Sequence, residues 1–79
     1  MNFECRYIPV IQLELGKSMR NFDPDIKDLI KSIHKNGIIT PLIVKLNRDS
    51  GKYTILDGSR RYIAAKELGI DEVLVIEVK

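Results

Sequence analysis

The chain has 79 residues, of which 13 are Lys or Arg and 11 are Asp or Glu, so its formal net charge is only +2. A chain of this length forms one small domain with a thin core. Its 44% hydrophobic and 30% charged residues are typical of an ordinary soluble globular protein. The balanced charge does not identify a nucleic-acid binder, so any anion site must come from local clustering.

Cysteine content and hydropathy help to predict the cellular compartment of the chain. Cys5 is the single cysteine, which excludes an internal disulfide and a cysteine metal cluster. No apolar run approaches the roughly 18 residues that a membrane helix needs, and the N-terminus has no apolar signal core. We therefore expect one domain, residues 1–79, in the cytoplasm and without a membrane partner.

Four segments predict strands. Their apolar residues alternate with polar ones or run continuously, and turn residues such as those of Asn47 to Lys52 separate them. The four are residues 7–15, with Pro9 at the start, where proline is tolerated, and residues 41–46, 53–56 and 71–79. The middle two form a predicted hairpin.

Two segments predict helices. Residues 22–37 begin with Asp23 as N-cap and Pro24 as first helical residue. Residues 59–68 form the second helix, which Gly69 ends. The first helix carries one apolar stripe, made of Ile26, Leu29, Ile30 and Ile33. The order strand, helix, strand, strand, helix, strand predicts an α+β fold, with a small mixed sheet covered by two helices.

The segment ILDGSRRYIAAKELGI contains a sharp strand-to-helix turn at Asp57-Gly58. Arg60 and Arg61 stand in the first turn of the helix, where the helix dipole disfavours cations. Gly58 lets a ligand approach the backbone closely, and the Ser59 hydroxyl can cap the helix. Free N–H groups at a helix start bind phosphate, and arginine grips phosphate oxygens two at a time. The turn therefore predicts an anion site.

A purely structural role for the same turn stays open. A strand-to-helix turn that contains Gly-Ser is common, and Gly-x-x-Arg is a far weaker signal than a full phosphate loop. Arg60 and Arg61 could be solvated, or one could pair with Asp57. Asp57 could instead orient an arginine or hold a metal ion that accompanies a nucleotide.

Two coupled motifs resemble the N-terminal domain of ParB partition proteins, within the ParB/sulfiredoxin-like superfamily (the ParB-like nuclease domain). The first is residues 36–44, an Asn-Gly helix end followed by a Pro-Leu strand, and the second is residues 55–69, with Gly-Ser-Arg-Arg and Ala-Ala. The resemblance runs from about Ile8 to the last residue. It implies the ParB/sulfiredoxin-like α+β fold.

The family implies a function and a site. Partition ParB proteins bind and slowly hydrolyse CTP in this domain, so the resemblance implies a phosphate turn made of Gly58, Ser59, Arg60 and Arg61. The loop arginine of the family falls on Arg20. The implied ligand is a nucleoside triphosphate, CTP or ATP, with Mg²⁺, and the implied setting is DNA partition, on a plasmid or a chromosome, with DNA as a further partner.

Departures from the family pattern open alternatives. The family has a glutamate associated with hydrolysis where this chain has Ser59, so the CTPase activity is an open question. The second nucleotide motif, the helix-turn-helix and the dimerisation domain are absent from these 79 residues, which fits a fragment, a minimal member or a subunit that dimerises. The alternatives are a non-catalytic DNA- or protein-binding module and a small-molecule kinase of the free-serine type, with Asp57 and Glu14 as acid/base candidates.

Other polar and reactive residues predict little by themselves. Cys5 is expected to be a small, partly buried residue, and the lone His34 has no partner for a metal site. The tyrosines Tyr53 and Tyr62 are expected in packing rather than stacked on a base. The cations Lys45, Arg48 and Lys52 gather near the hairpin, as a basic edge for nucleic acid or as a solvated loop.

Overall fold

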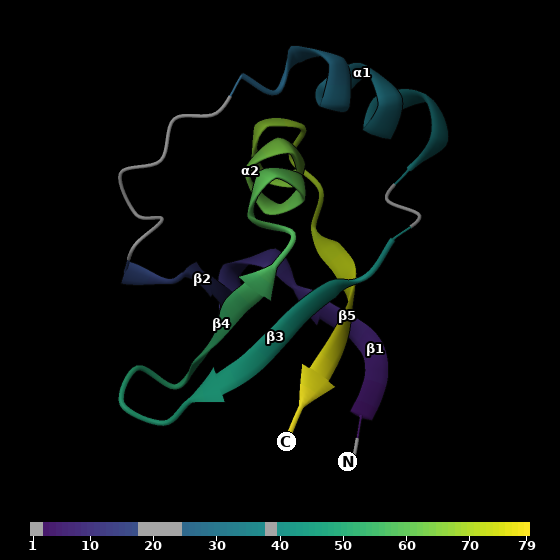
Figure 1. Ribbon diagram of the computed structural model, residues 1–79. Coiled ribbons are helices and arrows are strands. Elements are labelled where there is room, and N and C mark those ends of the chain that lie inside the picture. Colours follow the sequence, from purple (N-terminus) through teal and green to yellow (C-terminus); the bar gives the residue numbers. More distant parts are fainter. Residues whose placement is uncertain (1–2, 18–24, 38–39) are drawn as a thin grey trace.

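The computed structural model describes residues 3–17, 25–37 and 40–79 (Figure 1). It contains a five-stranded sheet, two α-helices and one 3₁₀ turn. In chain order the elements are β1 (Phe3–Pro9), η1 (Val10–Gln12), β2 (Leu13–Leu15), α1 (Lys27–Asn36), β3 (Leu42–Asn47), β4 (Lys52–Asp57), α2 (Ser59–Glu67) and β5 (Glu72–Val78). Within the described residues, no helix is long and apolar enough to cross a membrane.

The sheet has the strand order β1-β5-β3-β4-β2. β1 pairs with β5 and β3 pairs with β4 in antiparallel fashion, whereas β3 with β5 and β2 with β4 run parallel. The sheet is therefore mixed, and the α+β prediction is confirmed. The predicted hairpin, the second helix and the last strand all form within one or two residues of their expected bounds.

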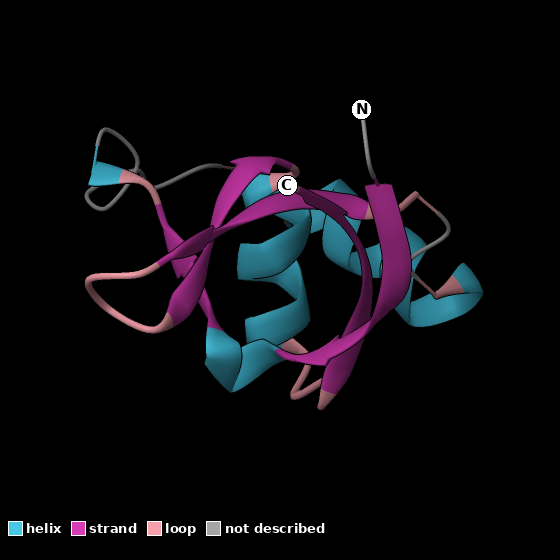
Figure 2. Ribbon diagram, turned by 90° about the horizontal axis from the view of Figure 1, so that it is seen from below, coloured by secondary structure: helices cyan, strands magenta, loops and turns pink. Residues whose placement is uncertain are grey.

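The prediction of one strand over residues 7–15 is wrong. The segment divides at Pro9 into β1 and β2, which lie at opposite edges of the sheet although only the three residues of η1 separate them. The proline thus ends a strand instead of starting one. Because so short a link joins the two edges, the sheet must curl strongly, and Figure 2 shows the curvature of its strands as seen from below.

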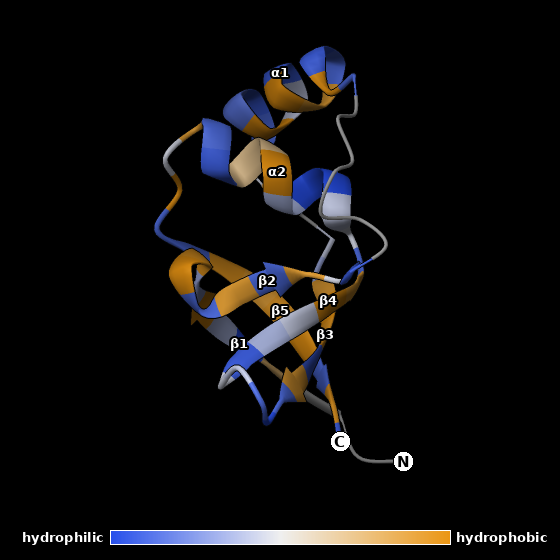
Figure 3. Cartoon of the chain, turned by 90° about the vertical axis from the view of Figure 1, so that its left-hand side faces the viewer, coloured by the Kyte–Doolittle hydropathy of each residue, from blue (hydrophilic) through white to orange (hydrophobic). Residues whose placement is uncertain are grey.

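The helix α2 is sandwiched between the sheet and α1. Tyr62 and Ala65 pack in the main core with strand residues such as Val44 and Val75. On the other side, Ala64 packs against Ile26 and Ile33 at α1. The exposed surface of both alanines is 0%, and their small side chains let the layers approach closely. Figure 3 shows the orange, apolar side of α1 turned toward α2.

The first helix begins later than the sequence predicts. α1 starts at Lys27, preceded by Ile26 in a non-helical conformation, and the predicted caps Asp23 and Pro24 lie outside the described residues. Its end at Asn36 agrees with the prediction, and the Gly37 N–H donates to Ile33 O at 2.7 Å. The apolar stripe is confirmed, since Ile26 and Ile33 are buried and the other two positions are partly buried.

Candidate functional site

The turn between β4 and α2 has the geometry of a helix start that can receive an anion. Gly58 is the N-cap residue, with φ of +98°, and the first helical residue is Ser59. The Tyr62 N–H, which donates to Gly58 O at 3.0 Å, is the first to bond back into the helix. The N–H groups of Ser59, Arg60 and Arg61 precede it and have no partner within an α-helix. These donors and the helix dipole favour a negative charge here.

The Ser59 hydroxyl does not have the role that the sequence predicts. Ser59 was expected to cap the helix through its hydroxyl, but it is already helical and makes no side-chain capping hydrogen bond. The cap position is taken by Gly58, because the positive φ needed there is costly for any residue with a Cβ.

Gly58 is also required by packing. A Cβ added at this position would collide with Leu42 Cδ2 and would lie 3.5 Å from the Leu42 Cα. Leu42 is fully buried in the core, so its side chain has little room to move. The turn is thus held against the start of β3, which fixes the position of the helix start relative to the sheet.

A register shift in the sheet precedes the turn. Val44 pairs with Ile55, but the residue before it in β3, Ile43, pairs with Asp57 instead of Leu56. The extra residue, Leu56, is 56% exposed and lines the cleft described below. Bulges of this kind redirect side chains and are frequent beside functional sites. No sequence pattern indicated it.

A cleft of about 790 Å³ opens beside the turn. Its volume falls within the range of roughly 300–1,000 Å³ typical of small-molecule sites. Its lining combines an apolar part with the turn itself and comes from β4, the start of α2, α1 and the residue that follows β2. The lining residues are Gly16, Leu29, Thr54, Ile55, Leu56, Asp57, Gly58, Ser59, Arg60 and Arg61. Four of the five predicted site residues therefore line one cleft.

The two arginines have different surroundings. Arg60 is exposed, and its Nη2 donates a hydrogen bond of 2.8 Å to the backbone oxygen of Asp25, just before α1. Arg61 is half-buried and has no hydrogen bond or ion pair within the described residues. Neither arginine pairs with Asp57 in this part of the chain. Arg60 thus connects the turn to α1, whereas the Arg61 guanidinium has no protein acceptor there.

The other candidates lie in different places. Arg20 falls outside the described residues. Asp57 lines the cleft, but Glu14 is not among the lining residues. The Glu14 carboxylate accepts hydrogen bonds from Asn47 Nδ2 at 3.0 Å and Thr54 Oγ1 at 2.9 Å, so it helps to hold β2 beside the hairpin. These contacts give Glu14 a structural role in the sheet.

Three further expectations are now resolved. Cys5 was expected to be partly buried but is exposed on β1, an edge strand. Tyr62 is buried, and its hydroxyl lies 3.4 Å from Leu13 O, so its packing role is confirmed. Tyr53 is half-buried and accepts a hydrogen bond from Arg6 at 2.8 Å. Neither tyrosine lines the cleft.

Known sequences that are similar to this chain include chromosome-partitioning and nucleoid occlusion proteins. The chain is 36% identical over 76 residues to the Deinococcus radiodurans protein named "Probable chromosome 2-partitioning protein ParB", which covers 92% of this chain and 25% of that protein. It is 37% identical over 76 residues to the nucleoid occlusion protein of a Geobacillus strain, which covers 92% of this chain and 27% of that protein. The chain thus spans about a quarter of the length of these relatives.

Solved structures with the same fold include nucleotide- and DNA-bound partition proteins. A truncated Caulobacter crescentus ParB complexed with CTP-γ-S matches with a TM-score of 0.85 and 26% identity, over 96% of this chain and 44% of that one. The same protein complexed with the centromeric parS site matches with a TM-score of 0.82 and 27% identity, over 94% of this chain and 40% of that one. Sulfiredoxin from Arabidopsis thaliana matches with a TM-score of 0.80 and 25% identity, over 96% of this chain and 85% of that one.

The fold, the turn and these relatives agree with one another. The curled mixed sheet and its two helices are the architecture of the ParB and sulfiredoxin structures. The model of the ParB N-terminal domain family matches residues 3–79, which is nearly the whole sequence. The chain therefore belongs to the ParB N-terminal domain family.

Proposed function

We propose that this chain binds a nucleoside triphosphate, CTP, in the cleft beside the α2 turn, and that it serves DNA partition or another DNA-associated process. The observation that carries the proposal is the convergence of Arg60, Arg61 and the first N–H groups of α2 on one cleft. Backbone donors and guanidinium groups are the usual partners of phosphate oxygens. The relative complexed with CTP-γ-S supports the choice of CTP.

The apolar part of the cleft supports a ligand larger than phosphate. Leu29 of α1, together with Ile55 and Leu56 of β4, lines the same hollow as the turn. A base and a ribose need contact surface of this kind beside the phosphate contacts. We therefore infer that the phosphates lie at the turn and that the nucleoside lies against these residues. Arg20, which follows Gly16 and Lys17 in the chain, would help to close the site.

We infer binding without efficient hydrolysis. Among the ten residues that line the cleft, Asp57 is the one carboxylate, and Ser59 stands where the family has a glutamate. A serine hydroxyl carries no charge with which to hold a metal ion or orient water. Mg²⁺ commonly binds through one or two carboxylates together with the phosphates of its ligand, which fits a site with Asp57 alone. Phosphate release at the background rate is the expected outcome of a turnover assay.

Thermal unfolding with CTP, ATP, ADP and GTP, each with Mg²⁺, tests the proposal. A ligand at 100 times its dissociation constant stabilises the folded state by about 2.7 kcal/mol, which for a chain of this size raises Tm by roughly 10–20 °C. We expect this rise with CTP and its loss in Arg60→Ala/Arg61→Ala. Lys31→Ala/Lys35→Ala on α1 removes the same charge and is the matched control. Unchanged Tm with every nucleotide would reject the proposal.

A second candidate is a module that binds no nucleotide and whose basic turn meets DNA phosphates. The parS complex of a relative supports a connection with DNA. Salt separates the two functions, because binding to a phosphate backbone weakens steeply as salt rises and does not depend on the base of a free nucleotide. A kinase of the free-serine type would instead consume nucleotide only when its acceptor is present.

A further inference from the structure

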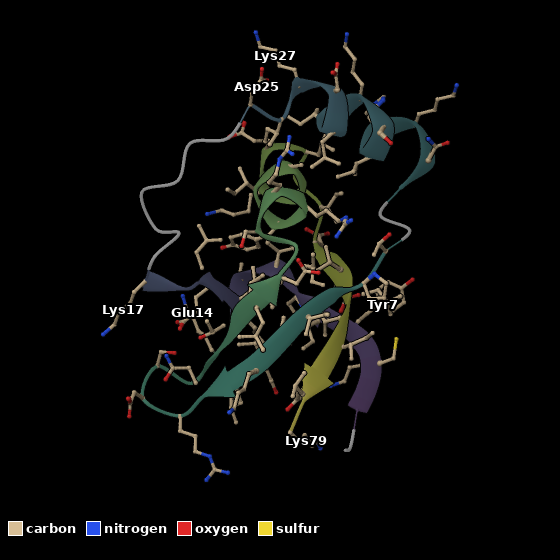
Figure 4. The ribbon with its side chains drawn as sticks, in the orientation of Figure 1. Tyr7, Glu14, Lys17, Asp25, Lys27 and Lys79 are labelled. Atoms are coloured by element: carbon tan, nitrogen blue, oxygen red, sulfur yellow. The ribbon has the colours of Figure 1, made fainter. Side chains whose placement is uncertain are left out.

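The end of the hairpin between β3 and β4 lies far from the nucleotide cleft. The strand β4 starts at Lys52 beside the hairpin turn and ends at Asp57 beside the cleft. Six extended residues span about 17–20 Å. Figure 1 shows the turn of the hairpin on the side of the sheet away from α1 and α2, and Figure 4 shows Lys79 at that same end. This end of the molecule therefore forms a surface of its own.

A shallow groove of about 330 Å³ lies at the hairpin end. Its lining residues are Lys45, Leu46, Arg48, Glu77, Val78 and Lys79, contributed by β3, the hairpin turn and the end of β5. The three cations are all exposed. Glu77 is the one acid of the six, and it is 7% exposed and paired with Arg6 of β1, whose Nη2 lies 2.6 Å from its Oε1. Lys45 and Arg48 therefore give the solvent side of this groove a positive charge.

Part of the lining of the groove is apolar. Leu46 is 39% exposed, and Val78 is half-buried. A ligand that fills the groove must therefore bring negative charge at intervals and a less polar surface between the charges. The backbone of a duplex does both, because phosphates alternate with deoxyribose faces. Cations that come from separate segments, Lys45 from β3 and Arg48 from the hairpin turn, favour such an extended polyanion over a single small anion.

We propose that the hairpin end, defined by Lys45, Arg48 and Lys79 around Leu46, is a docking surface for the phosphate backbone of duplex DNA. The nucleotide cleft takes no part in it, so this proposal stands or falls independently of the proposed function. Contacts to phosphate carry little sequence information. The surface therefore holds DNA without choosing its sequence.

Fluorescence anisotropy with a labelled duplex of mixed sequence, about 20 base pairs long, tests this surface. We expect weak binding in low salt, with log K falling against log[salt] with a slope of about −2 to −3, since each neutralised phosphate contributes about −0.9. Lys45→Glu/Arg48→Glu should weaken binding by at least about tenfold and flatten the slope by roughly two units.

The matched control is Lys27→Glu/Lys31→Glu on α1, at the end of the molecule where Figure 4 labels Lys27. Both variants change the formal net charge from +2 to −2, because each replaces two cations by two anions. All four side chains are exposed, so both variants should keep the wild-type urea midpoint. Lys45→Ala/Arg48→Ala serves as a milder second variant if charge reversal disturbs the fold.

Several results would overturn the proposal. One is an absence of anisotropy change at low salt, and another is an equal loss in the hairpin and α1 variants, which would show a general effect of net charge. A loss confined to Arg60→Ala/Arg61→Ala would move DNA to the α2 turn. Binding of an acidic peptide such as poly-glutamate with the same affinity and the same loss in Lys45→Glu/Arg48→Glu would assign the groove to a protein partner.

Discussion

Arg6 in β1 and Glu77 in β5 form an ion pair of 2.6 Å. The same guanidinium donates to the Tyr53 hydroxyl of β4 at 2.8 Å and lies 5.4 Å from the centre of its ring. One side chain therefore connects three strands, of which β1 and β4 are not neighbours. The hydrogen bonds to Glu77 and Tyr53 raise the pKa of Arg6 above the usual range of arginine.

Replacing Arg6 by Met should lower the free energy of unfolding by about 1–3 kcal/mol, because the buried Glu77 carboxylate then loses its partner. Arg6→Met/Glu77→Leu should recover most of the loss, since no unpaired charge remains. Urea unfolding measures both effects. A single variant within about 0.5 kcal/mol of wild type would contradict a structural role for the pair.

The contribution of Arg6 to the free energy of unfolding should be constant across neutral pH. A raised pKa stabilises the folded state fully at any pH below the pKa of arginine in the unfolded chain, and the effect is lost only as the pH rises through the higher folded value. The difference in unfolding free energy between wild type and Arg6→Lys, a residue that titrates lower, should therefore stay flat between about pH 6 and 8. A slope in that difference would show that another group titrates with the pair.

Gly58→Ala should destabilise the fold by more than Gly51→Ala. Both glycines have a positive φ, +98° and +74°, so both variants bear the cost of a left-handed alanine, about 1 kcal/mol. A Cβ at Gly51 meets nothing within 4 Å, whereas one at Gly58 collides with Leu42. Urea unfolding of the two variants separates the conformational cost from the steric cost. Equal losses would show that Leu42 moves aside freely.

Arg60→Ala and Arg61→Ala should have different effects on the ligand-free chain. Both are expected to weaken nucleotide binding, but Arg60→Ala also removes the hydrogen bond to Asp25 O and should speed hydrogen exchange in the first turn of α1. Arg61→Ala should leave exchange in α1 and the stability of the ligand-free chain within about 0.5 kcal/mol of wild type. Faster α1 exchange in both variants would contradict a specific link through Arg60.

Ser59→Glu should stabilise the ligand-free chain by about 0.3–1 kcal/mol, because the first turn of α2 contains no acid and a carboxylate there favours the helix dipole. Ser59→Lys, which adds a third cation to that turn, should have the opposite sign. Ser59→Gln controls for side-chain size. Thermal unfolding at low ionic strength measures the series, and high salt should shrink the differences. A shift of the same sign for Glu and Lys would rule out the dipole as the cause.

Local patterns predicted most elements but not their partners. The apolar stripe and Asn36-Gly37 placed the first helix end, and Gly58 placed the start of α2, because short-range chemistry decides these features. The split at Pro9 was missed, since Ile11 and Leu13 alternate with polar residues as a strand does. Ile11 is 83% exposed and Leu13 is buried, a difference that tertiary packing alone determines.

Within the site, the turn was predictable and its connections were not. Gly58 to Arg61 are consecutive, so the sequence predicts their proximity. The hydrogen bond from Arg60 joins residues 35 positions apart, and the ion pair of Arg6 joins residues 71 positions apart. No periodicity encodes contacts of that range. The bulge at Leu56 depends on register with β3, which is likewise absent from the local pattern.

The last strand in the chain order, β5, lies inside the sheet, between β1 and β3. During synthesis on a ribosome, β1 emerges before the other described strands, and β5, its neighbour in the described sheet, emerges after every other described element. Until then, the edges of both β1 and β3 remain open to wrong partners, including other nascent chains. β5 must therefore insert between β1 and β3 after both have been synthesised, and this insertion is a single late step in forming the sheet.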